Sequence, residues 1–203
     1  MPNTFTNAIF NGTALKRIVV TVAVLALTLT TVTISSLALF TDSETVPNNA
    51  FSAGTLDLTA SPATAALSMP AMNPGDQITG VITVGNAGSI ALRYAMPSTT
   101  TEDTFAGALV MTVKSGVATC DDANFAVSGT VLYSGPLGTN APPTAVFGSN
   151  AQGVQGGERS LTPGSTEDLC VNVTLPLTAT NASQGLTTSA SFTFDGEQIA
   201  NNP

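Results

Sequence analysis

The side chains that could do chemistry in this chain are two cysteines and thirteen carboxylates, because its 203 residues include no histidine. Zinc hydrolases usually bind their metal partly through histidine, and a Ser-His-Asp triad requires a histidine outright. A cysteine nucleophile would likewise lack an imidazole base. The sequence therefore predicts a protein that is not an enzyme and that uses no cofactor and no metal ion.

Six of the carboxylates form pairs of adjacent residues, and these pairs are the best candidates for an acid/base dyad in the sequence. The pairs are Glu102-Asp103, Asp121-Asp122 and Glu167-Asp168. Adjacent residues on a strand point to opposite faces, so we expect each pair to lie on solvated surface. One alternative stays open, in which Asp121 and Asp122 supply oxygen ligands to Ca²⁺, although no Asp-x-Asp-x-Asp loop accompanies them. Asn172-Val173-Thr174 and Asn181-Ala182-Ser183 match the glycosylation acceptor pattern.

The first 38 residues have the composition of an export signal. Two basic residues precede the uncharged and mainly apolar residues 18–39, and Ser36 and Ala38 match the small-x-small pattern of signal peptidase sites. We expect cleavage between Ala38 and Leu39, so that the chain contacts the membrane only before cleavage. The alternative is an uncleaved anchor, because about 20 apolar residues can span a bilayer. In both cases the remaining chain lies outside the cytoplasm, either secreted into an extracellular matrix or held at the cell surface.

The two cysteines are predicted to form a disulfide. Cys120 and Cys170 are the two cysteines of the chain. An even number of cysteines in a protein of an oxidising compartment indicates disulfide pairing. A loop of roughly 50 residues closed in this way contributes roughly 4 kcal/mol in the chain-entropy treatment. Cys170 alternates with the apolar residues of its predicted strand, so the disulfide would fasten a loop to the outside of a sheet.

The charge of the chain beyond the predicted signal is strongly negative. All thirteen acidic residues follow Leu39, whereas three basic residues do, which gives a net charge of −10. Such a surface repels nucleic acid and anionic lipid. Charged residues make up only 9% of the chain, so Thr, Ser, Asn and Gly carry most of the polarity, as suits a β-rich surface outside the cell.

Alternating apolar and polar residues predict β-strands in almost all of the remaining chain. The predicted strands are residues 51–58, 77–84, 90–94, 109–113, 131–133, 168–175 and 188–194. Turns are expected at residues 73–76 and 85–88, a short helix at residues 101–106, and a long surface excursion at residues 134–157 with an apolar piece at 145–147.

This pattern predicts an all-β fold, an antiparallel jelly-roll-like β-sandwich preceded by a signal peptide helix. An immunoglobulin-like topology is the alternative, but the chain has no Trp. The predicted organisation is a signal peptide at residues 1–38, an extended donor segment at 39–50 and a β-sandwich domain at 51–203.

Four motifs in sequence order resemble those of a known family. They are Phe40-Thr41-Asp42, Phe51-Ser52-Ala53-Gly54-Thr55-Leu56-Asp57-Leu58, Met72-Asn73-Pro74-Gly75-Asp76 and Gly85-Asn86-Ala87-Gly88-Ser89-Ile90. Together they resemble the TasA/camelysin family, whose precursors are processed by a signal peptidase of the SipW type. The resemblance covers residues 38–94 and returns, more weakly, at residues 191–198.

The resemblance implies a jelly-roll subunit of extracellular fibres in a biofilm matrix. Family members assemble head to tail by donor-strand complementation, in which the mature N-terminus of one subunit completes a sheet of the next. Here the donated strand would contain Leu39, Phe40 and Val46, and the partner would be a second copy of the chain. An accessory fibre protein is a further partner that the resemblance implies.

Three alternatives stay open. The segment from Leu39 to Pro47 could be a frayed terminus, as many termini are. The chain could instead be a monomeric adhesin, or an accessory that caps or anchors such fibres. Some camelysin-like proteins are described as metalloproteases, which leaves a secreted protease as the third alternative.

Overall fold

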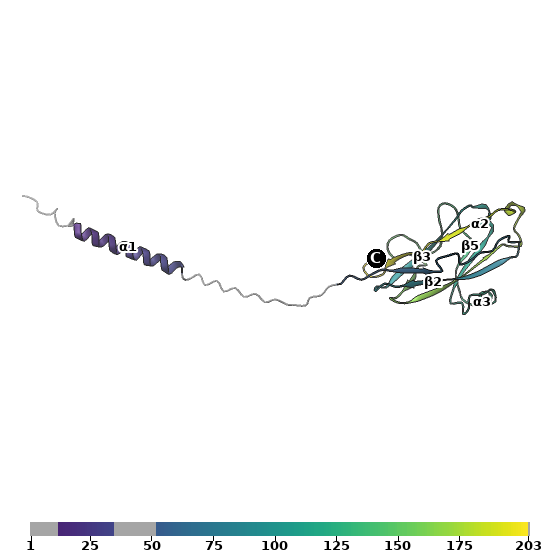
Figure 1. Cartoon of the computed structure of the whole chain (residues 1–203), viewed down its shortest axis with the longest axis horizontal. Coiled ribbons are helices and arrows are strands. Elements are labelled where there is room, and N and C mark those ends of the chain that lie inside the picture. Colours follow the sequence, from purple (N-terminus) through teal and green to yellow (C-terminus); the bar gives the residue numbers. More distant parts are fainter. Residues whose placement is uncertain (1–11, 35–51, 203) are drawn as a thin grey trace, which may run out of the picture. The chain divides into compact units, whose positions relative to one another are not determined.

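The computed structural model describes residues 12–34 and 52–202, with side chains described from residue 12 to 27 and from 52 onward. These residues belong to two units, which divide between Phe51 and Ser52. The first unit contains the helix α1 (Gly12–Ile34), and Figure 1 shows it together with the β-rich second unit. No helix in the described ranges has both the length and the hydropathy to cross a membrane. The predicted cleavage site, Ala38 and Leu39, and the predicted donor residues Phe40 and Val46 lie outside the described residues.

The second unit is mostly β and contains two antiparallel sheets, with few helices. The first sheet has the strand order β1-β2-β8-β4-β5. Its strands are β1 (Leu58–Ser61), β2 (Gln77–Asn86), β8 (Thr166–Thr174), β4 (Val110–Ser115) and β5 (Thr130–Pro136). β8 is the centre of this sheet, because it pairs with β2 on one side and with β4 on the other.

The second sheet is built around β3 (Leu92–Thr100). Two short strands follow each other along one of its edges, β9 (Ala190–Phe192) and β10 (Asp195–Gln198). Two more follow each other along the other edge, β6 (Thr144–Phe147) and β7 (Arg159–Leu161). Each edge of this sheet is therefore an interrupted strand.

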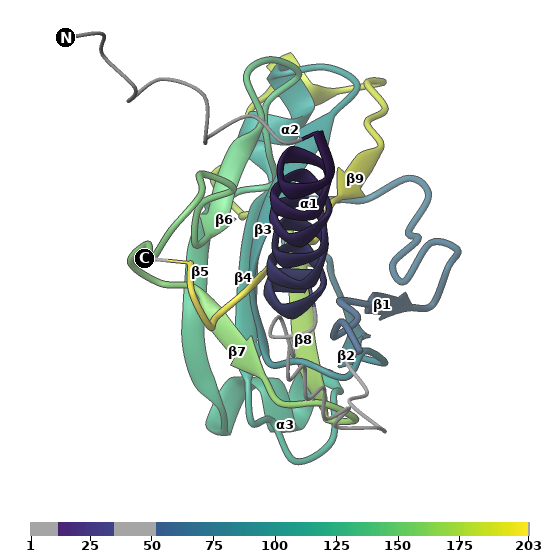
Figure 2. The same cartoon turned by 90° about the vertical axis from the view of Figure 1, so that its left-hand side faces the viewer.

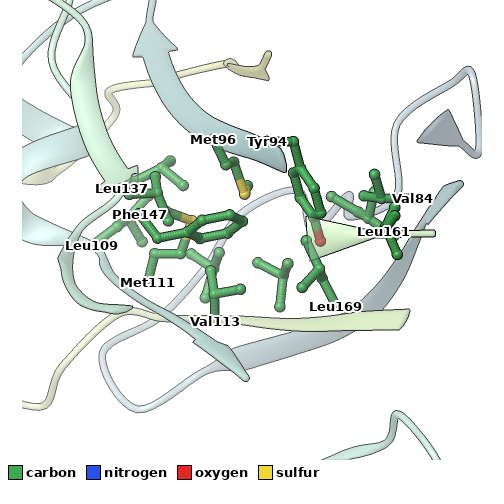
Figure 3. Packing of buried hydrophobic residues seen from close by; sticks show 14 of the residues in the cluster. Val84, Tyr94, Met96, Leu109, Met111, Val113, Leu137, Phe147, Leu161 and Leu169 are labelled. Atoms are coloured by element: carbon green, nitrogen blue, oxygen red, sulfur yellow. The ribbon is translucent and has the colours of Figure 1, made fainter. Parts of the chain in front are cut away.

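Inward side chains of both sheets form a single hydrophobic core (Figure 3). The predicted alternation is confirmed in β2, where Ile82 and Val84 are buried while Val81 is exposed. In β8 the apolar residues Leu169, Val171 and Val173 belong to the core as predicted, but Cys170 and Asn172 on the other face are buried as well. The remaining core residues include Leu92, Tyr94, Met96, Leu109, Met111, Val113, Leu137, Phe147 and Leu161.

Two short α-helices and one 3-10 helix complete the second unit: α2 (Thr104–Ala108), α3 (Asp122–Val127) and η1 (Asn181–Ser183). α2 confirms the short helix expected near residues 101–106. Glu102 caps it, because its carboxylate accepts hydrogen bonds from the backbone N–H groups of Phe105 and Ala106.

The turn predicted at residues 73–76 is confirmed. The N–H of Asp76 donates to the carbonyl of Asn73 at 2.9 Å. Gly75 adopts φ +101°, a conformation that residues with a Cβ atom rarely adopt. The turn is also joined to the first sheet, because the N–H of Gly75 donates to the carbonyl of Leu175 at 2.7 Å.

Some predicted elements differ from the structure in their bounds, and some elements were not predicted. The first strand begins at Leu58 rather than Phe51, because residues 52–57 run against the turn at residues 87–90. There the N–H groups of Ala87 and Ser89 donate to the carbonyls of Asp57 and Thr55. The turn predicted at 85–88 begins later, since β2 continues to Asn86. The helix α3 and the strand β7 were not predicted.

Candidate functional site

The three carboxylate pairs do not form acid/base dyads, because the two members of each pair have different partners. In the first pair, Glu102 caps α2, whereas Asp103 accepts a hydrogen bond from the N–H of Asn140 at 2.6 Å. In the second pair, Asp121 accepts from the N–H of Asn124 at 2.8 Å, whereas Asp122 accepts from the hydroxyl of Thr79. In the third pair, Glu167 binds Arg159, whereas Asp168 accepts from the hydroxyl of Thr83 at 2.6 Å. Each carboxylate therefore has a structural partner of its own.

Asp121 acts as the N-cap of α3 rather than as a free ligand. Its side chain accepts from both the backbone and the side-chain amide of Asn124, and these hydrogen bonds lower its pKa. Within the described ranges, no group of three or more His, Cys, Asp or Glu residues is placed to hold a metal ion.

Glu167 belongs to a partly buried polar cluster between the sheets. Burial alone would raise the pKa of this carboxyl, but hydrogen bonds from Arg159 and Tyr94, together with the charge of Arg159, lower it overall. Burial raises the pKa of the Tyr94 hydroxyl, and so does its hydrogen bond to Glu167 at 2.7 Å. The cluster thus requires an ionised carboxylate in the folded protein.

This cluster should make the domain sensitive to acid. The pKa of Glu167 is lower in the folded chain than its ordinary value of 4.5. Such a carboxyl stabilises the fold at pH values above its ordinary pKa, and this stabilisation is lost as the pH falls through the pKa of the folded state. We expect the melting temperature to drop as the pH falls below 4.5, and to drop less steeply in a Glu167→Gln variant. Thermal melts across this range compare the two proteins, and equal slopes would contradict the assignment.

The predicted disulfide between Cys120 and Cys170 is present, with a Cα–Cα distance of 5.4 Å. Cys170 lies on β8 on the face opposite the core, as predicted, and is 2% exposed. On β4, Lys114 pairs with Cys170, and its Nζ lies 4.6 Å from the ring centroid of Phe125 in α3. The disulfide therefore fastens α3 and its loop to the outside of the first sheet.

The two glycosylation acceptor patterns differ in exposure. Asn172 is 6% exposed, and its side-chain amide donates to the hydroxyl of Thr79 at 2.8 Å. Asn181 begins η1 and is exposed. Only the second side chain is accessible in the folded domain.

The second unit contains a cleft with a volume of about 1370 Å³. Two stretches of the chain line its sides, residues 60–74 between β1 and β2 and residues 179–194 leading into and through β9. Figure 2 shows the β1–β2 connection reaching toward β9. None of the described residues that line the cleft is charged.

The floor of the cleft is made of apolar side chains from β2 and β8, from residues that flank β4, β5 and β8, and from α2. They are Ile78, Ile82, Phe105, Leu109, Leu137, Val173 and Leu175. Five of these are at most 6% exposed and belong to the main hydrophobic core, namely Ile82, Leu109, Leu137, Val173 and Leu175. The cleft is therefore an opening into the core, and apolar side chains that entered it would be removed from water.

Two sheet edges without a strand partner flank the cleft. β1 pairs with residues 83–86 of β2, and along that edge no described strand pairs with residues 77–82. β9 pairs with β3 alone among the described strands. Unpaired edges present backbone N–H and C=O groups that an added strand can bind.

Sequence reasoning did not identify this cleft. One signal for it is present, because residues 58–75 carry no charge between Asp57 and Asp76. Such a long uncharged connection is unusual on a surface, but nothing in its periodicity shows that it lies between two sheets. The predicted donor residues Leu39, Phe40 and Val46 lie outside the described residues, so the structure does not place them against the cleft.

The chain was compared with protein families, with curated proteins and with solved structures. No curated protein matches the chain. A solved structure that matches is that of Spo0M, a sporulation control protein from Bacillus subtilis, with 13% identity over 73% of this chain and a TM-score of 0.23. The chain spans about half of that protein, 49% of its length, and so distant a likeness supports no argument about function.

The family model that matches is described as camelysin metallo-endopeptidase, and it covers residues 13–114, half of the chain. The match spans α1 and the strands from β1 to β4, which include the cleft segment between β1 and β2. It confirms the resemblance that the four motifs indicated. This chain belongs to the TasA/camelysin family.

Proposed function

We propose that this protein is a secreted structural subunit of extracellular fibres, which assembles by donor-strand complementation. In this proposal the two sheets form a jelly-roll sandwich, a signal peptidase of the SipW type removes residues 1–38, and the new N-terminus enters the cleft of the next copy. The single observation that supports it most is the uncharged cleft of about 1370 Å³ flanked by two unpaired sheet edges.

The chemistry of the cleft matches that of an incoming strand. An extended segment satisfies unpaired N–H and C=O groups along an edge, while every second side chain enters the apolar space. Phe40 is the natural anchor, because burying one Phe side chain contributes about 1.5–3 kcal/mol. A contact between the N-terminus of one copy and the cleft of another is head to tail, so it does not close and grows into a filament.

The first test of this proposal is fibre formation by the secreted protein. On concentration, we expect electron microscopy to show fibres from the wild-type chain and monomers from a chain that lacks Leu39–Val46. Phe40→Ala should reduce fibre formation strongly, whereas Thr41→Ala is the matched control, because adjacent residues on a strand point to opposite faces. A deletion variant that still formed fibres would contradict strand donation, and a monomeric protein that still bound a surface would support the adhesin alternative.

A second candidate function, a metallo-endopeptidase, is favoured by the description of the family. Zinc peptidases activate a water molecule with a metal held by three protein ligands, and we propose that this chain does not do so. We expect no cleavage of casein by the purified secreted protein, with or without added Zn²⁺. Cleavage that a chelator abolished and Zn²⁺ restored would overturn this expectation.

A further inference from the structure

We propose that residues 54–57 and residues 86–90 form a clamp that positions the donor segment for the cleft of another copy rather than for the subunit's own cleft. The inference rests on the proposed function, which it extends by a physical cause for exchange between copies. Two of the four family motifs, residues 51–58 and 85–90, meet in this clamp. The proposed donor segment, residues 39–50, joins the domain through the first of them.

The two sides of the clamp are joined by hydrogen bonds. The N–H of Ala87 donates to the carbonyl of Asp57 at 2.8 Å, and the N–H of Ser89 donates to the carbonyl of Thr55 at 2.9 Å. In return, the N–H of Thr55 donates to the hydroxyl of Ser89 at 2.9 Å. Residues 54–57 are exposed, so these hydrogen bonds rather than burial hold them in place.

Two glycines allow the two sides of the clamp to approach each other closely. A Cβ atom at Gly88 would be 2.3 Å from the carbonyl oxygen of Thr55 and 2.8 Å from the backbone nitrogen of Asp57. A Cβ atom at Gly54 would be 2.3 Å from Cγ2 of Ile90. Non-bonded carbon atoms pack at about 3.5–4.0 Å, so a side chain at Gly88 must displace the backbone opposite it.

Asn86 fixes the second side of the clamp to the rest of the domain. It is 2% exposed, and its side-chain oxygen accepts from the N–H of Gly88 at 3.0 Å. Its side-chain nitrogen donates to the carbonyls of Ile90 at 2.8 Å and Leu161 at 3.1 Å. The turn is thereby tied to β7 and gives residues 54–57 a fixed partner.

The clamp places the attachment point of the donor segment away from the unpaired edge of β2. β1 and β2 are antiparallel, with Ser61 opposite Thr83. The clamp continues this register, because Thr55 is hydrogen-bonded to Ser89. The unpaired edge, residues 77–82, begins on the other side of Thr83. Six residues of extended chain from Ser61 back to Thr55 span about 20 Å, so the donor segment is attached about that far from the edge.

This position of the attachment point favours exchange between copies. A flexible segment that can reach a site on its own chain competes at an effective concentration of about 1 mM. At about 0.1 mM protein, it would exceed the segments of other copies roughly tenfold. That advantage falls when the geometry hinders the tether from spanning to the site. By holding the attachment point at the far end of β2, the clamp leaves the cleft to the segment of another copy.

The test is Gly88→Ala, which should open the clamp and let residues 39–57 fold back as one free tether. At about 0.1 mM protein, we expect the share of secreted chains that sediment as fibres to fall about tenfold. The soluble chains should resist cleavage after Glu44 by a Glu-specific protease, because insertion into their own cleft protects that peptide. Gly156→Ala is the matched control, because a Cβ atom there has nothing within 4 Å, and it should sediment like the wild type.

Two further variants keep the test decisive if Gly88→Ala does not melt cooperatively. Ser89→Ala removes the side-chain hydrogen bond to the N–H of Thr55 and should reduce sedimentation about threefold. The hydroxyl oxygens of Thr55 and Ser89 are 3.3 Å apart, so Thr55→Cys with Ser89→Cys should close the clamp covalently on oxidation. Chains with this closed clamp should form fibres as fully as the wild type, and a loss of fibres would overturn the proposal.

The outcomes separate the clamp from the proposed function. If the wild type forms fibres and both Gly88→Ala and Ser89→Ala sediment as fully, the clamp is overturned while strand donation stays intact. Soluble variant chains that are cut after Glu44 as readily as unassembled wild-type chains would also overturn it, because their clefts would not hold their own segments. A wild-type protein that forms no fibres would overturn the proposed function, and the clamp with it.

Discussion

Replacing the two cysteines, Cys120→Ser with Cys170→Ala, is expected to lower the free energy of unfolding by about 4 kcal/mol. The disulfide closes a loop with a sequence separation of 50 residues, and in the chain-entropy treatment that constraint acts mainly on the unfolded chain. The loop contains α3, β5, β6 and β7, so the unfolded chain gains freedom over a quarter of its length. Denaturant unfolding of the oxidised wild type and the double variant measures the difference.

The reduced wild-type protein is the control for this prediction. A thiol reductant should bring the wild type close to the double variant and should leave the double variant unchanged. Hydrogen exchange should also become faster in α3, because the disulfide and the contact of Lys114 with Phe125 fasten that helix to the first sheet. An unfolding midpoint that was the same with and without the disulfide would contradict this account of its role.

Arg93→Met is expected to lower the free energy of unfolding by about 3–5 kcal/mol, the range for removing one partner of a buried ion pair. The side chains of Arg93 and Glu158 are each 5% exposed, and Nε of Arg93 lies 3.4 Å from Glu158 Oε2. Arg93 also binds Glu197 and donates to the carbonyl of Asn202 at 2.9 Å. Without the guanidinium, the Glu158 carboxylate stays buried with no cation beside it. Calorimetry or denaturant unfolding gives the difference.

Neutralising Glu158 and Glu197 in the Arg93→Met variant distinguishes two causes of instability. One is the loss of the cation beside the carboxylates, and the other is the loss of the packing of the Arg93 side chain. A triple variant, Arg93→Met with Glu158→Gln and Glu197→Gln, leaves no unpaired buried charge and should recover most of the lost stability. If the single and triple variants were equally unstable, the loss would come from packing instead.

The sequence predicted the strands in which apolar residues recur at every second position. In β2 and β8 this alternation placed Ile82 and Val171 on the inner face and Cys170 on the outer one. The turn at residues 73–76 was predictable for a different reason, because Gly75 must adopt a positive φ. At these places the residue types of a turn and the two-residue repeat of a strand were sufficient to predict the structure.

Elements shaped by distant contacts could not be predicted in this way. Arg93 on β3 is 4% exposed because Glu158 and Asn202, both far along the chain, pack against it. β7 has only three residues and exists because Arg159 and Leu161 pair with Tyr94 and Leu92. α3 follows the N-cap Asp121, a signal that the sequence contains but that was interpreted as a surface pair or a calcium ligand.

Of the proposed site, the sequence indicated only the segment that a subunit would donate, and that segment stays a prediction. The motif at Phe40-Thr41-Asp42 indicated which residues a subunit would give, whereas the receiving cleft depends on how residues 60–74 and 179–194 come together. Those two stretches are separated by more than 100 residues and have no periodicity in common. Both stretches lack charged residues, but this indicates a cleft only once the fold is known to bring the two stretches together.

The most direct measurement is a photo-crosslink from the N-terminus of one copy into another. A benzophenone amino acid at position 40 is introduced into chains labelled with ¹⁵N, which are assembled with unlabelled wild-type chains and irradiated. Mass spectrometry should find crosslinks between a heavy and a light chain, with the attachment sites in residues 60–74 and 179–194. Crosslinks that stayed within single chains, or that joined two chains away from the cleft, would contradict the exchange of a strand between copies.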